Sequence, residues 1–261
     1  MRLNYCIFNV WIIIACILPS VSAKTVEEAF EEANQAYASA DMLLNQNDKQ
    51  KAEQSFNLAL ELYKTCLEKA ESTSLHFNMG NTYYKLGKPG YAIYHYRKAL
   101  QLDPSSEEVR ANLQLANQFA DLPLKEESLY EQTLGRQSPH FWKWVLCVTL
   151  WLGISLIILP RYFGFVGPVP LIIGFVVISI SVLPIIALKK ASDVKQLGII
   201  LEEDTPILVS PTQTSAIANY LQAGHTVSIN HSVKAAAYLY IISSQGDSGW
   251  IPTEKVGRLH P

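Results

Sequence analysis

Residues 73–106 read TSLHFNMGNTYYKLGKPGYAIYHYRKALQLDPSS, and this stretch decides the fold of the N-terminal half of the chain. Its spacing predicts two short helices that cross closely at Gly80 and Ala92, because a larger side chain there would push them apart. Tyr83 and Tyr96 fill the space beside the crossing. The full order of small and large residues is Met79, Gly80 and Tyr83, then Ala92, Tyr96 and Ala99, with Pro104 as the breaker.

This order resembles the tetratricopeptide repeat, a unit of about 34 residues that presents a concave surface to another polypeptide and carries no chemistry of its own. One unit cannot bury its own apolar face, so neighbouring units are expected. The spacing of the second helix recurs upstream at Ala52, Phe56, Ala59 and Leu60. Ala52 and Ala92 lie farther apart in the sequence than one repeat length, so the first unit is longer than usual. We therefore expect extended helices or a longer turn around residues 44–50. Residues 105–123 predict a closing helix.

The predicted binding face lies on the first helix of the central repeat and consists of Phe77, Asn81, Tyr84 and Lys85. Their spacing places them on one side of the helix, opposite the crossing face. Asn81 can donate to and accept from a peptide backbone, Lys85 can meet a carboxylate, and the two rings offer flat apolar area. The competing interpretation is a solvated helix face with no ligand. Gln35 and Gln118 occupy comparable places in the flanking units.

The first residues have the layout of a secretory signal peptide over residues 1–23, cleaved before Lys24. Arg2 precedes an apolar run over residues 5–18, and small residues follow it. Two alternatives stay open, a retained membrane anchor and a lipoprotein box in which Cys16 is lipidated. The apolar run continues past Cys16, which favours the signal peptide over the lipoprotein box.

Residues 141–159 and 170–188 each approach the roughly 20 apolar residues that a helix needs to cross a bilayer. The connection PRYFGFVGPVP is rich in proline and glycine and carries Arg161 as its only charge, which predicts a two-helix transmembrane hairpin over residues 141–188. Neither span holds an acidic residue, a histidine or an internal basic residue. The hairpin is therefore expected to anchor and pack rather than to conduct ions.

Two spans return the chain to one compartment, and a cleaved signal peptide places that compartment outside the cytoplasm. The positive-inside rule indicates the opposite orientation. Lys143, Lys189 and Lys190 lie at the outer ends of the two spans, whereas Arg161 is the only charge in the connection between them. We give the signal peptide more weight because the first segment usually sets the orientation. The prediction is a bacterial inner-membrane protein with both folded domains in the periplasm.

Residues 192–261 change to short strands, predicted at residues 198–201, 205–209, 226–229, 238–242 and 250–251. The order of these strands, with Gly224 before the third and Gly249-Trp250-Ile251 at the end, resembles the bacterial SH3-type domain. The resemblance implies a small all-β barrel in which Trp250 packs the core. Tyr238 and Tyr240 are expected inside the barrel with it.

No catalytic or metal-binding pattern stands out, so neither an enzymatic activity nor a cofactor is predicted. Without the signal peptide only Cys66 and Cys147 remain, one on a repeat helix and one in a span, and no disulfide is expected. Four histidines lack the further ligands that a zinc site needs, namely His76, His95, His225 and His231. His76 and His95 are expected to pack inside the repeats. Acidic residues outnumber basic ones between residues 24 and 139, which excludes nucleic-acid binding.

The order of these parts resembles the BatE branch of the Bacteroides aerotolerance (Bat) proteins over nearly the whole mature chain. The sequence NMGNTYYKLGKPGYAIYHYRKALQLDP followed by ANLQLA, the hairpin opened by tryptophans and the SH3-like end carry the resemblance. The layout is a tetratricopeptide domain (24–122), a linker (123–140), the hairpin and an SH3-like domain (192–261).

The resemblance implies a periplasmic adaptor in an envelope complex linked to aerotolerance or stress. Its partners would be membrane proteins with von Willebrand factor type A domains and a cytoplasmic MoxR-type ATPase. The alternative hypothesis is a peptidoglycan-associated module in which the SH3-like domain binds the cell wall and the repeats act as a spacer.

Overall fold

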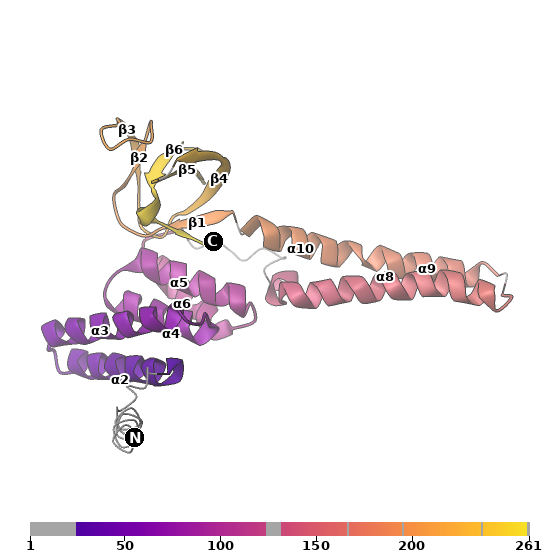
Figure 1. The fold of residues 1–261 in the computed structure, drawn as a ribbon, viewed down its shortest axis with the longest axis horizontal. Coiled ribbons are helices and arrows are strands. Elements are labelled where there is room, and N and C mark those ends of the chain that lie inside the picture. Colours follow the sequence, from indigo (N-terminus) through magenta and orange to yellow (C-terminus); the bar gives the residue numbers. More distant parts are fainter. Residues whose placement is uncertain (1–24, 124–131, 166, 195, 236, 260–261) are drawn as a thin grey trace, which may run out of the picture.

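The structure is a computed structural model that describes residues 25–123, 132–165, 167–194, 196–235 and 237–259. It consists of a helical N-terminal domain, a pair of long apolar helices and a C-terminal antiparallel sheet (Figure 1). The predicted signal peptide, the alternative lipidation site at Cys16 and part of the predicted linker lie outside the described residues.

The helical domain contains two packed helix pairs and a closing helix. The elements are α2 (Val26–Asn45), α3 (Lys49–Leu67), α4 (Thr73–Lys85), α5 (Pro89–Leu102) and α6 (Glu107–Phe119). The first pair is longer, with 20 and 19 residues against 13 and 14 in the second. Only residues 46–48 separate α2 from α3. Extended helices, and not a longer turn, therefore account for the stretched first unit.

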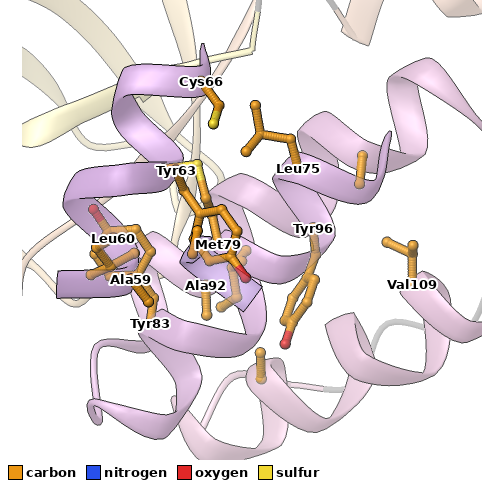
Figure 2. Close-up of a cluster of buried hydrophobic side chains, with 14 of the residues drawn as sticks. Ala59, Leu60, Tyr63, Cys66, Leu75, Met79, Tyr83, Ala92, Tyr96 and Val109 are labelled. Atoms are coloured by element: carbon orange, nitrogen blue, oxygen red, sulfur yellow. The ribbon is translucent and has the colours of Figure 1, made fainter. Parts of the chain in front are cut away.

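The close crossing predicted at Gly80 and Ala92 is confirmed. A Cβ atom on Gly80 would lie 2.6 Å from the Tyr96 ring, and Ala92 is fully buried. Figure 2 shows the core at this crossing, where α3, α4 and α5 contribute Tyr63, Met79 and Tyr96. Because the ring of Tyr96 lies directly over the backbone of Gly80, no other residue type fits this position without a shift of the helices.

The apolar helices of the hairpin are α8 (Pro139–Tyr162), α9 (Val169–Ile180) and α10 (Val182–Val194). Two helical segments, α8 and the combined run of α9 and α10, are long and apolar enough to cross a membrane. The second run is interrupted at Ser181, whereas one uninterrupted helix was predicted. Pro184 explains the interruption, since it has no N–H group to donate to the carbonyl oxygen of Ile180 one turn earlier.

Close backbone contact holds the hairpin together. A Cβ atom on Gly153 would lie 3.0 Å from the carbonyl oxygen of Gly174, and one on Gly174 would lie 2.9 Å from that of Gly153. The hydroxyl groups of Thr149 and Ser181 are also 3.0 Å apart. Since the chain turns back on itself, the helical domain and the sheet lie at the same end of the hairpin (Figure 1).

The sheet has seven antiparallel strands in the order β3-β2-β6-β5-β4-β1-β7. They are β1 (Leu197–Ile200), β2 (Thr205–Leu208), β3 (Ile217–Leu221), β4 (Thr226–Ala235), β5 (Tyr238–Ser243), β6 (Ser248–Pro252) and β7 (Val256–Arg258). All seven contribute to one buried aliphatic cluster, so the sheet curls around a single core. The sequence pattern predicted five of these strands and missed β3 and β7.

The aromatic residues expected in the core of this domain are elsewhere. Tyr238, Tyr240 and Trp250 are only half-buried, and the rings of Tyr240 and Trp250 meet edge to face, with centroids 5.3 Å apart. Isoleucine, leucine and valine side chains fill the interior instead. The prediction failed because residues alternate between the two faces of a strand, and these three share the outer face.

The sheet packs directly against α5. Ile199 and Leu259 belong to the same buried cluster as the core of the helical domain. A Cβ atom on Gly257 would lie 2.5 Å from the ring of Tyr94, and one on Gly224 would lie 2.5 Å from Ile93. The sheet therefore covers the side of α5 that faces away from the other repeat helices. No local pattern predicted this contact, because the hairpin separates the two segments in the chain.

Candidate functional site

A cavity of about 230 Å³ opens on the helical domain between α2, α4 and α6. All four residues of the predicted binding face line it, namely Phe77, Asn81, Tyr84 and Lys85. The other lining residues are Tyr37, Tyr96, Glu108, Asn112 and Leu115. We call this cavity the groove. Its walls come from both repeats and from the closing helix, so no single helix pair could form it.

The helix α4 turns two different faces to its surroundings. Gly80 and Tyr83 are buried against the rest of the domain, as expected for the crossing face. The four predicted residues lie at intervals of one and two turns on the other side and are half-buried or exposed. The spacing argument thus identified the open side of the helix correctly.

A hydrogen-bond network fixes the orientation of the Asn81 side chain. Its Oδ1 atom accepts from the Tyr96 hydroxyl at 2.7 Å and from Asn112 Nδ2 at 2.9 Å. Burial raises the pKa of Tyr96, so this hydroxyl keeps its proton. Since both partners meet the oxygen, the amide nitrogen of Asn81 is left to donate into the groove.

The same network recurs one unit earlier. The Oδ1 atom of Asn34 accepts from the Tyr63 hydroxyl at 2.7 Å and from Asn78 Nδ2 at 2.9 Å. Asn78 and Asn112 are separated by the repeat period of about 34 residues, and this spacing was the signal that could have identified both. We call these two networks the asparagine networks. Each one ties a first helix to its partner helix and to the next unit.

The two glutamines singled out from the sequence do not line the groove. Gln35 is exposed and donates to Glu31 on its own helix at 3.4 Å, and Gln118 is exposed as well. Asn34, the neighbour of Gln35, occupies the place that corresponds to Asn81 instead. A shift of one residue turns a helical side chain by about 100°, which moves it off the face.

Two carboxylates give the groove its electrostatic character. Asp41 forms an ion pair with Lys85, and this hydrogen bond raises the pKa of the lysine. Glu108 is exposed in the first turn of α6 and has no hydrogen-bond or ion-pair partner among the described residues. Its neighbour Glu107 points elsewhere and pairs with Arg136 at 2.7 Å.

The apolar part of the groove is left open at the closing helix. Leu115 is 49% exposed and Phe119 is 55% exposed, and the Phe119 ring meets Tyr84 edge to face at 5.5 Å. Phe77 and Tyr96 lie 6.1 Å apart between ring centroids. Flat aromatic surface beside amide donors is suited to a polypeptide ligand.

His76 and His95 are buried in the repeat core, as predicted, and they also form a polar chain. His76 Nε2 lies 2.8 Å from the Glu71 carboxylate, and the two Nδ1 atoms lie 2.9 Å apart. His76 Nε2–H donates to the Glu71 carboxylate, so in the neutral ring Nδ1 carries no proton and accepts from His95 Nδ1–H. Burial lowers the pKa of both histidines, most strongly that of His95.

Within the residues that the structure describes, no group of three potential metal ligands occurs. Cys66 is buried in α3, and Cys147 lies in α8. His225 is bonded to the backbone of Gln222. The prediction that the chain is not an enzyme stays a prediction.

Comparison with known families identifies the class of this domain. Two sequence models of the tetratricopeptide repeat match, one over residues 27–66 and one over residues 74–106. They correspond to the α2–α3 and α4–α5 pairs. No curated protein and no solved structure matches the chain.

The chain thus carries tetratricopeptide repeats, modules whose concave surfaces bind other proteins. It also carries two helices suited to a membrane anchor.

Proposed function

We propose that this protein is a membrane-anchored adaptor whose groove binds a segment of another polypeptide. The observation that carries this proposal is the groove itself, where aromatic rings surround an asparagine amide held ready to donate. A pre-positioned donor costs less entropy on binding than a mobile one. The hairpin would hold the groove at a fixed height above the bilayer.

The finer proposal is a periplasmic adaptor of the Bat type, anchored in the bacterial inner membrane. The resemblance of the repeat sequence, hairpin and C-terminal domain to the BatE branch supports it. Its partners would then be von Willebrand factor type A membrane proteins that work with a MoxR-type ATPase. Reporters active only outside the cytoplasm, fused after residue 139 and after residue 261, test the location, and silence of both would place the domains in the cytoplasm.

The adaptor function is tested by replacing Asn81, Tyr84 and Lys85 with alanine together. We expect the triple variant, still folded by circular dichroism, to lose the partners that the wild-type protein recovers from membranes. The control carries Asn57→Ala and Lys64→Ala on α3, outside the groove. Full recovery of every partner by the triple variant would refute the assignment of the groove.

A second candidate function is binding of the cell wall through the C-terminal domain, here proposed to be SH3-like. The half-exposed pair of Tyr240 and Trp250 favours it, since aromatic faces can stack on sugar rings. Sedimentation of the full-length protein with peptidoglycan sacculi, compared with Trp250→Ala, tests it. Equal sedimentation of both proteins would argue against this surface.

A further inference from the structure

The chemistry of the groove defines what kind of segment it accepts. We propose that the occupant is an extended polypeptide segment with an apolar side chain next to a lysine or arginine, and not a segment that ends in a free carboxylate. This inference rests on the adaptor function proposed above and deepens it. Three observations carry it: the fixed donor, the aromatic lining and the unpaired carboxylate.

The fixed donor selects for a carbonyl group. Both hydrogen bonds to Asn81 end on its oxygen, so the amide can only donate to a ligand. A backbone carbonyl of an extended segment is the common acceptor in polypeptides. The asparagine networks also keep this amide from rotating, because a flip would break two hydrogen bonds at once.

The lining selects for an apolar side chain beside that carbonyl. Tyr37, Phe77 and Tyr84 come from α2 and α4, and Leu115 from α6 closes the other side. A cavity of about 230 Å³ has room for one such side chain. Apolar area buried there stabilises a complex and offsets part of the costs of association.

The charges select for a cation. Lys85 is the positive group of the lining, and Asp41 already neutralises it. Glu108 is the one charged lining residue without a partner among the described residues. A ligand carboxylate would meet Glu108 without a free cation to offset it, whereas a lysine or arginine would pair with Glu108. The surplus of acidic residues in the whole domain acts in the same direction.

The test uses the full-length protein in detergent and short blocked peptides that share a Gly-Ser frame and one phenylalanine. The residue after phenylalanine is Lys, Glu or Gln, and a further Gln peptide keeps a free carboxylate end. Fluorescence anisotropy should show the Lys peptide binding about fivefold more tightly than the Glu peptide, the scale of one partly exposed ion pair. Equal affinities, or a preference for Glu or for the free carboxylate, would overturn the proposal.

Two variants assign the preference to the groove. Glu108→Gln should remove the advantage of the Lys peptide, whereas Glu107→Gln in the same helical turn, outside the lining, should keep it. Tyr84→Ala should weaken all peptides by about tenfold through lost apolar contact. Failure of every peptide to bind the wild type would also reject this occupant. The adaptor function would still be judged separately, by partner recovery with the triple variant.

Discussion

The buried pair of His76 and His95 makes the stability of the repeat domain depend on pH. His95 lies between Tyr83 and His76, and the positive charges of Lys98 and Lys64 act on it from α5 and α3. A proton added to His76 Nδ1 would oppose the N–H group of His95 at 2.9 Å. Among the residues that the structure describes, Glu71 is the one acidic group bonded to the pair and able to offset the charge of its protonated form.

We predict that acid destabilises the repeat domain, because both histidines are buried in their neutral form. The pKa of both histidines is lower in the folded chain than in the unfolded one, so the unfolded state takes up more protons below about pH 6.5. This loss of stability is absent well above about pH 6.5 and grows as the pH falls between the unfolded and the folded pKa of each histidine, by at most about 1.4 kcal/mol per pH unit for one histidine. Thermal unfolding between pH 7.5 and 5 measures it.

The variant His95→Phe keeps the ring against Tyr83 and removes one titrating group. We expect its melting temperature to depend less on pH over the same range, while the wild type loses stability toward pH 5. The same dependence in both proteins would show that other groups cause the effect.

The close crossing of α4 and α5 depends on a single glycine, Gly80. We expect Gly80→Ala to destabilise the repeat domain by about 1–3 kcal/mol, because the new methyl group would overlap the Tyr96 ring. Gly167→Ala is the control, since no atom lies within 4 Å of its Cβ position. A melting temperature lowered equally by both substitutions would contradict this explanation.

At the scale of elements, local patterns were sufficient wherever burial followed a regular period. The repeat helices and the spans were predicted because small and large residues recur at helical spacing over many turns. β3 was missed because four of its five side chains are exposed and show no alternation. β7 was missed because it has only three residues.

Local sequence patterns also predicted only part of the groove. The open face of α4 follows from helical spacing, and so Phe77, Asn81, Tyr84 and Lys85 were predicted. The place of Glu108 in the lining and the hydrogen bonds of the asparagine networks result from contacts between helices that are far apart in the sequence. A single sequence does not contain those distances.

The contact of α5 with the sheet makes a prediction for two elements. Gly257→Leu should place a side chain where the Tyr94 ring lies and separate the sheet from the repeats. We expect faster amide hydrogen exchange in both α5 and β7 of the intact protein. Ser244→Ala, in an exposed turn of the same domain, is the control and should leave α5 unchanged. Unchanged exchange in α5 of the Gly257 variant would show that the two parts are not joined.

For the whole molecule, these contacts imply that the repeats and the sheet form one packed unit rather than two independent modules. The sheet occupies one side of α5, and the groove lies between α2, α4 and α6 on another part of the domain. The groove therefore stays accessible while the sheet is docked. A partner bound there would be held at a set orientation to the sheet.

The most direct measurement is site-specific photo-crosslinking in cells that contain the native partners. A photoreactive phenylalanine analogue at Tyr84 lies in the groove, and one at Leu58 lies on α3, 51% exposed and outside the groove. We predict a discrete crosslinked polypeptide from position 84 that is absent from position 58 and is lost with Asn81→Ala and Lys85→Ala. Equal crosslinking from both positions, or none from position 84, would contradict the proposal that the groove binds a polypeptide.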